Sequence, residues 1–274
     1  MTPAPITAGR LGLGVSGPHG AAVMPARMTA DLVRAAFGLG VRVFDTGPSY
    51  GEGEAERLLG QALAAVPRAD CIVSTKAGIT ASGVQRRRDF SVDAVRRSLD
   101  GSLTRLGCET IDWLFLHGPS PQDMSDALLK ALEAEVAAGR IGRLGVCGRG
   151  EEIDAALALE RFDVVMAPVH AGLEHSALQR LARVKAAGVM LVGIETLSQT
   201  LKAYPFPASF GAAYRLARSL YRGPLVARRA PMTAAKAFAW AIGEGGADFV
   251  VTTTTRLAHL RANAAAIAQI TRAR

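Results

Sequence analysis

The chain has 274 residues, of which 49% are hydrophobic, 20% charged and 5% aromatic. This composition excludes a disordered chain, a collagen-like chain and a small disulfide scaffold, and a chain of this length can bury a large core. The net charge of +8 is spread along the chain, with 86–88 as its only arginine triplet. We interpret this charge as solvated surface with an attraction for small anions, which excludes a nucleic-acid partner.

The chain carries neither a membrane segment nor a cysteine framework. No uncharged apolar run reaches the roughly 18 residues of a membrane span, and residues 1–10 lack the apolar core of a secretory signal. The three cysteines, Cys71, Cys108 and Cys147, lie far apart without a CxxC motif. This spacing argues against disulfides and a structural zinc site, so we expect a cytoplasmic protein with neither a metal nor a membrane partner.

Short β-branched segments alternate with segments of helical periodicity along the whole chain. The predicted strands lie at 11–15, 41–45, 71–76, 111–117, 144–147, 164–167, 189–194 and 249–253. The predicted helices lie around 32–39, 55–65, 92–106, 125–138, 153–161, 178–187, 210–220, 233–242 and from 257 onward. Thr29 is the predicted N-cap of the first helix, and Ser91 and Gly107 bound the third.

Eight strand–helix units follow one another without a change in composition or a linker. Parallel strands need crossover helices, and eight such units close into a barrel that has no edge strand. We therefore predict an α/β fold, a single (β/α)8 TIM barrel over residues 1–274, with a long loop at 195–212 after the seventh strand. A doubly wound sheet is the alternative, but no strand leads into a G-x-G-x-x-G turn.

Four ionisable residues gather where three consecutive strands end. Asp45, Lys76 and His117 end the second, third and fourth strands, and Tyr50 lies in the loop after the second. Active sites of such barrels lie at the carboxyl ends of the strands. Each residue alone has a structural interpretation: a turn cap, a solvated lysine, a core histidine or a packed aromatic ring. Their coincidence on one rim favours a catalytic cluster.

This set of residues suits proton donation to a carbonyl oxygen. A tyrosine hydroxyl has a pKa of about 10 in water, and a nearby ammonium group lowers it by stabilising the phenolate. A carboxylate holds the lysine charged, and a neutral histidine orients the carbonyl oxygen by a hydrogen bond. Because no side chain supplies a hydride, the chemistry implies a nicotinamide cofactor.

Several motifs, in chain order, carry a family resemblance. They are FDTGPSYGEGE at 44–54, STK at 74–76, RRSLDGSLTRLG at 96–107 and IDWLFLHGP at 111–119. Together they resemble the aldo-keto reductase family over most of the chain. The resemblance implies a catalytic tetrad of Asp45, Tyr50, Lys76 and His117, with Tyr50 as the general acid. It also implies NADPH as the cofactor, with NADH possible, and a small aldehyde or ketone as the substrate.

The same resemblance implies the cofactor-binding residues but is uneven at the nicotinamide end. Cys147 and Gly148 replace a Ser-Asn pair, Met166 replaces a glutamine, and Ile194 replaces an aromatic residue. Thr253 and His259 stand at the positions of the basic contacts to a 2′-phosphate. The implied cofactor-binding residues are Gly14, Ser16, Asp45, Cys147, Gly148, Met166, Ile194, Thr253, Thr254, His259 and Asn263.

Three other functions remain open on the sequence. Lys76 could form a Schiff base in a lyase, and the chain could hold a nucleotide as a sensor or scaffold without turnover. A metal hydrolase could use Asp45, His117, His170 and Glu195, although no H-x-H or HExxH spacing supports it.

The substrate and the oligomeric state cannot be read from the pattern. In the resembled family, a tail after the last helix shapes the substrate pocket, whereas this sequence stops near its last helix. We therefore expect 16–27 and 197–211 to form the pocket walls and the mouth to be open.

Overall fold

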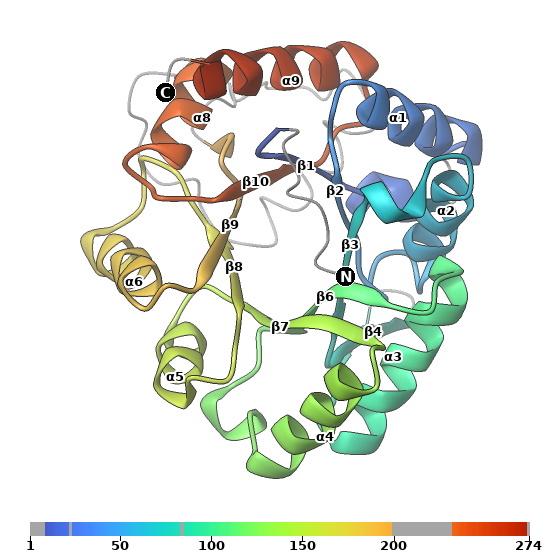
Figure 1. Cartoon of the computed structure of the whole chain (residues 1–274), viewed down its shortest axis with the longest axis vertical. Helices are drawn as coiled ribbons and strands as arrows, with labels where there is room; N and C mark the ends of the chain where they lie inside the picture. The colour runs from blue at the N-terminus through green and yellow to red at the C-terminus, as the bar shows by residue number, and fades with distance from the viewer. Residues whose placement is uncertain (1–8, 22–23, 83–84, 199–231, 273–274) are drawn as a thin grey trace.

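The computed structural model describes residues 9–21, 24–82, 85–198 and 232–272. In these residues, parallel strands form a closed barrel in the order β1–β2–β3–β6–β7–β8–β9–β10 (Figure 1). The barrel strands are β1 (Leu11–Gly14), β2 (Val43–Asp45), β3 (Ile72–Ala77), β6 (Ile111–His117), β7 (Ile141–Cys147), β8 (Val164–Pro168), β9 (Met190–Ile194) and β10 (Phe249–Thr252). The pairing of β1 with β10 closes the ring, which confirms the predicted (β/α)8 barrel and excludes the doubly wound sheet.

Helices surround the barrel as an outer ring (Figure 1). They are α1 (Ala26–Gly38), α2 (Glu54–Leu63), α3 (Val92–Leu106), α4 (Asp126–Ala137), α5 (Glu151–Leu159), α6 (His175–Ala186), α8 (Ala234–Ile242) and α9 (Leu257–Arg272). The Ser91 hydroxyl accepts a hydrogen bond from the Ala94 N–H, and α3 ends at Gly107 with a φ of 64°, as predicted. Among the described helices, none is long and apolar enough to cross a membrane.

Two predicted features lie wholly or mostly outside the described residues. These are the helix at 210–220 and the long loop at 195–212, of which only 195–198 are described. The second pocket wall, at 197–211, falls in the same part of the chain.

The predicted cap of the first helix is wrong. The helix begins at Ala26 after Pro25, so Thr29 lies inside it and is fully buried. The Thr29 hydroxyl is hydrogen-bonded to Nδ1 of the buried His19 at 2.9 Å and therefore does not cap a helix. A contact with a residue ten positions away thus overrides the local capping preference of threonine.

A β-hairpin that the sequence pattern did not predict follows β3. Its strands β4 (Ile79–Ser82) and β5 (Gln85–Arg88) pair antiparallel as a separate two-stranded sheet. The β5 strand is fully exposed and consists of glutamine and arginine, so it lacks the apolar alternation that marks a half-buried strand.

The core has two layers separated by the barrel wall. The larger layer lies between the strands and the helices. The smaller one comprises Val43, Trp113, Phe115, Cys147, Val164, Met166, Val192 and Val251. Alternate residues of a strand point to the same side. Because Val43 and Phe115 belong to the smaller, inner layer, Asp45 and His117, two positions later, face the same interior at its carboxyl end.

A buried carboxylate joins the second and third units. Glu56 of α2 has no exposed surface. It accepts hydrogen bonds from Thr75 Oγ1 at 2.5 Å, Ser102 Oγ at 2.8 Å and Arg105 Nε at 2.6 Å. These donors belong to β3 and α3, so one side chain fixes α2 against both elements next to the site.

Replacing this carboxylate should destabilise the fold. We expect Glu56→Ala to lower the free energy of unfolding by about 3 kcal/mol, because it leaves buried donors and Arg105 without their acceptor. The matched control is Glu54→Ala, which removes an exposed pair with Arg57 on the same helix and should change stability little. Urea unfolding followed by circular dichroism measures both variants. Equal losses in the two variants would contradict the proposed role of the buried network.

Candidate active site

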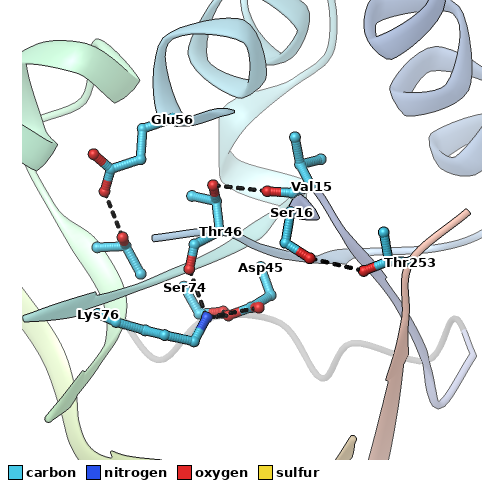
Figure 2. Close-up of polar contacts among 9 residues, drawn as sticks. Val15, Ser16, Asp45, Thr46, Glu56, Ser74, Lys76 and Thr253 are labelled. Carbon is cyan, nitrogen blue, oxygen red and sulfur yellow. Dashed lines mark hydrogen bonds and ion pairs between the residues drawn. The ribbon is translucent and has the colours of Figure 1, made fainter. Parts of the chain in front are cut away.

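A buried ion pair lies where β2 and β3 end. Lys76 Nζ donates to both carboxylate oxygens of Asp45 at 2.8 Å and to the Thr46 carbonyl at 2.6 Å (Figure 2). Lys76 is 1% exposed and Asp45 5% exposed. An ion pair this deep is well shielded from solvent, so the lysine is held in one place and in one charge state.

Two neighbouring residues that the sequence analysis did not single out hold this pair in position. Ser74 Oγ donates to Asp45 Oδ1 at 2.8 Å, and Thr46 Oγ1 donates to the Val15 carbonyl at 3.0 Å (Figure 2). Thr46 N–H also donates to the Ser74 carbonyl, so the ends of β1, β2 and β3 are fastened together. The alternation of side chains could have identified Ser74, because it lies two positions before Lys76 on the same face.

The charge of Lys76 follows from two opposing effects. Burial is the largest single effect and lowers the pKa of Lys76, but the Asp45 carboxylate, Tyr50 and Cys147 together raise it by more, so the pKa lies above its usual range. Lys76 therefore stays an ammonium group at working pH. A Schiff base requires the neutral amine, so this environment argues against the predicted lyase alternative.

Tyr50 and His117 complete a compact group around Lys76. Lys76 Nζ lies 5.3 Å from the centre of the Tyr50 ring, and the Tyr50 and His117 ring centres are 6.3 Å apart in an edge-on arrangement. Tyr50 stands in the loop between β2 and α2, and His117 ends β6. The structure thus brings together the four residues predicted as catalytic, from three consecutive strand–helix units.

His117 lies in surroundings that keep its ring neutral. Burial, followed by the positive charges of Lys76, Arg86, Arg88 and Arg149, lowers the pKa of His117 to about 3. Its Nδ1 is buried and has no hydrogen-bond partner among the described residues. A neutral imidazole carries one donor and one acceptor nitrogen, so the ring can offer a hydrogen bond to a bound molecule.

Two of the predicted cofactor residues contact each other beside the ion pair. Ser16 Oγ and Thr253 Oγ1, which follow β1 and β10, are 3.0 Å apart (Figure 2). A Cβ atom at Gly14 would lie 2.6 Å from Thr253 Oγ1. The glycine therefore lets the two strand ends approach, and β1 and β10 continue the rim next to Asp45.

Of the other cofactor residues predicted near β1 and β10, Thr254 and Asn263 have separate hydrogen-bond partners. The Thr254 carbonyl is 3.0 Å from Nε2 of His19, and Asn263 Nδ2 donates to Thr252 Oγ1 at 3.5 Å. Asn263 is buried, whereas His259 lies exposed on α9. His19 was not singled out in the sequence. It is fully buried and connects this strand end to α1.

The predicted nicotinamide-side residues lie on the opposite arc of the rim and are mainly apolar. Cys147 pairs in register with Met166, and both side chains belong to the inner core. Burial raises the pKa of the Cys147 thiol to about 11, so the thiol stays neutral. Ile194 is half-buried against the same core. Gly148 is closed in by Glu152, whose side chain would lie 2.4 Å from an added Cβ.

An ion pair bridges this arc above the apolar residues. Arg149 Nη1 and Nη2 donate to the two carboxylate oxygens of Glu195 at 3.0 and 2.6 Å. Glu195 has a φ of 56°, an uncommon conformation for a residue with a side chain. Thr196 and Ser198, which follow it, have buried hydroxyl oxygens without a partner among the described residues.

The predicted metal-site alternative receives no support from the geometry. Across the described ranges, no three side chains of histidine, cysteine, aspartate or glutamate come together in a way that could hold a metal ion. Both carboxylates of this alternative are already paired with a basic residue: Asp45 with Lys76, and Glu195 with Arg149. The four residues named for this alternative therefore do not form one ligand set.

Comparisons with known proteins match a family model and several curated relatives. The model of the Aldo/keto reductase family matches residues 10–272. L-galactose dehydrogenase of Arabidopsis thaliana is 35% identical over 62% of this chain and 55% of its own length, and D-threo-aldose 1-dehydrogenase of a Pseudomonas species is 27% identical over 61% of each. The chain thus spans less than two thirds of the length of these curated relatives.

Solved structures show the same fold. An aldo-keto reductase from Bacillus halodurans superposes with a TM-score of 0.77 at 20% identity, covering 95% of this chain and 87% of its own. An aldo-keto reductase from Klebsiella pneumoniae in complex with NADPH superposes with a TM-score of 0.69 at 22% identity, covering 96% and 90%.

The low pKa of His117 should make stability depend on pH. The unfolded chain takes up this proton near pH 6.5, whereas the folded chain does so only near pH 3, so folding loses stability as pH falls below 6.5. Between pH 7 and 5 we expect wild type to lose about 2 kcal/mol more than His117→Gln. Urea unfolding at both pH values measures the difference. Equal pH dependence in the two proteins would show that His117 does not contribute.

Proposed function

Because the chain belongs to the Aldo/keto reductase family, we propose that it reduces the carbonyl group of a small aldehyde or ketone and, in reverse, oxidises the corresponding alcohol. When bound, a reduced nicotinamide dinucleotide supplies the hydride for the carbonyl carbon. The protein supplies the proton for the carbonyl oxygen, so the products are an alcohol and the oxidised cofactor.

The observation that carries this proposal is the buried Lys76–Asp45 pair beside the Tyr50 ring. Tyr50 is the proton donor, and it becomes a phenolate when it gives up its proton. A permanent ammonium group close to the ring stabilises that phenolate. Because Lys76 directs its N–H groups to Asp45 and Thr46, it acts on Tyr50 through its positive charge.

His117 orients the substrate in this proposal. Its ring is neutral at working pH, so it donates a hydrogen bond to the carbonyl oxygen without competing for the proton of Tyr50. Asp45 does not touch the substrate. It keeps Lys76 charged and in place.

The residues present are compatible with a bound dinucleotide. The buried hydroxyls of Thr196 and Ser198, which have no partner among the described residues, offer donors for phosphate oxygens. On the β1–β10 side, Ser16 and Thr253 offer further hydroxyls, and we place Gly14, Thr254, His259 and Asn263 in the same half of the site. At the nicotinamide end, Cys147, Gly148, Met166 and Ile194 would surround the ring with apolar atoms and few hydrogen-bond donors.

We propose NADPH as the cofactor, with NADH as the alternative. A structural neighbour is in complex with NADPH, and a relative from Escherichia coli, 28% identical, is named NADH-specific methylglyoxal reductase. The names of relatives that refer to aldoses and galactose support a small polar carbonyl compound as the substrate class.

One observation favours a second candidate function. Cys147 and Met166 are buried in the inner core and lack amide groups that could hold a carboxamide. A protein with such surroundings could bind a nucleotide without turnover and act as a sensor or scaffold. The preserved Lys76, Asp45, Tyr50 and His117 group is the reason that we favour the enzyme.

Two further proposals concern the chain as a whole. We propose that residues 1–274 act as one barrel domain, which the single closed ring of strands supports. We also propose a reducing compartment such as the cytoplasm, because none of the three cysteines forms a disulfide and two of them are buried.

Removing the Tyr50 hydroxyl should lower turnover strongly and leave cofactor binding nearly unchanged. We expect Tyr50→Phe to lower kcat for an aldehyde about 10²- to 10⁴-fold, the range typical of a lost general acid. Cofactor affinity should stay within about twofold of wild type, because the ring and the charge of Lys76 remain. Consumption of NADPH measures turnover, and fluorescence of the bound reduced nicotinamide measures affinity.

The outcomes distinguish the two candidate functions. Cofactor binding without turnover of any aldehyde by wild-type protein would favour the sensor. Undiminished turnover in Tyr50→Phe would exclude Tyr50 as the proton donor.

A further inference from the structure

The unpredicted β4–β5 hairpin lies beside the candidate active site. It follows β3, which carries Lys76, and it is fastened to the loop after β6. Arg88 Nη2 donates to the Gly118 carbonyl at 2.7 Å, and Gly118 directly follows His117. The Arg88 guanidinium also lies 3.3 Å from Asp123 Oδ2. The β5 strand is therefore held against the rim on the side of His117.

The two faces of β5 carry different arginines. Arg88 pairs with Ile79, Arg87 with Thr80 and Arg86 with Ala81 in the antiparallel register. Because side chains alternate along a strand, Arg86 and Arg88 share the face that is turned to the rim, and Arg87 lies on the other. Two residues of a strand span about 7 Å, so Arg86 stands one step further along the same face from the Gly118 contact.

The arginines near the rim differ in whether their charge is balanced. Arg149 is paired with Glu195, Arg88 with Asp123, and Arg87 with Asp89 at 3.9 Å. Arg86 is exposed and forms no ion pair with any described residue. Its charge still reaches the site, since it contributes to the lowered pKa of His117 after burial and Lys76. Within the part of the chain that the structure describes, the charge of Arg86 is thus unbalanced on the side of the rim that carries His117.

We propose that Arg86 binds a carboxylate group of the substrate, so that the protein prefers carbonyl compounds that bear a negative charge. This inference rests on the proposed carbonyl reduction and names its substrate class. The carboxylate is bound and not changed, and only the carbonyl group is reduced. A planar guanidinium group matches the two oxygens of a carboxylate and forms a charge-assisted contact with it.

The hairpin that carries Arg86 lies away from the residues that we assign to cofactor binding. In the ring of strands, β1 and β10 lie on one side of β2, and β3 with its hairpin lies on the other. The hydroxyls that we assign to the phosphate half, on Ser16 and Thr253, belong to the first side. Arg86 should therefore affect the Michaelis constant of the substrate and leave that of the cofactor unchanged.

The test uses substrates that match in size and differ in charge. They are 4-formylbenzoate with 4-formylbenzamide, and 3-formylbenzoate with 3-formylbenzamide, each assayed with NADPH and wild-type protein. We expect kcat/KM for at least one formylbenzoate to exceed that of its amide about tenfold, which corresponds to about 1.4 kcal/mol. The preference should shrink in 0.5 M salt, because an exposed ion pair is screened.

Two variants with the same change of charge form the matched comparison. Arg86→Gln should remove the preference by raising KM for the formylbenzoate while kcat/KM for the amide stays within about twofold. Arg87→Gln, on the opposite face of the same strand, should keep the preference. A preference absent from wild type for both isomers, or equal losses in the two variants, would overturn the proposal. A raised KM for NADPH in Arg86→Gln would overturn it as well.

The two proposals fail in different ways. If neither the formylbenzoates nor the amides are reduced, the proposed carbonyl reduction fails, and with it the basis of the inference. If the amides are reduced at least as well as the formylbenzoates, the reduction stands and only the role of Arg86 is lost.

Discussion

The arrangement of this site depends on one buried ion pair. Lys76 and Asp45 lie almost without exposed surface and contact each other through both carboxylate oxygens. Burying two charges costs free energy, and a well-packed apolar pair in the same place is often as stable or more so. The pair therefore does not need to exist for the sake of folding. In the proposed function, the pair keeps a positive charge next to the Tyr50 ring.

The barrel makes such a pair tolerable. Asp45 and Lys76 stand on neighbouring parallel strands, and side-chain alternation turns both toward the interior, just above a closed layer of apolar residues. Thr46 and Ser74 supply the remaining hydrogen bonds from the same strand ends. The two charges thus sit at strand ends, where neighbouring groups form hydrogen bonds with both of them. A site built on strand ends is better defined than one built on loops alone.

The sequence predicted the parts of the molecule that repeat. The strands, most helix boundaries and the convergence of Asp45, Tyr50, Lys76 and His117 follow from periodicity and from the rule that strand ends meet. The sequence pattern did not predict contacts between residues that lie far apart in the chain. Thr29 binds His19 instead of capping its helix, and the β4–β5 hairpin has no apolar alternation to reveal it. Local patterns encode which face is buried, but they do not encode which polar partners meet.

Lys76 and Arg86 carry the same charge but differ in burial, and the two proposals give them different roles. Lys76 is enclosed, and its charge is balanced by Asp45, so its field acts on its immediate neighbour Tyr50 and is barely screened by salt. Arg86 is exposed and unbalanced by any described residue, so its field extends into solvent, where it can meet an incoming anion. In the two proposals, the buried charge acts on a proton and the exposed charge acts on the choice of substrate. In a protein of net charge +8, the position of each charge relative to the barrel rim matters more than the total.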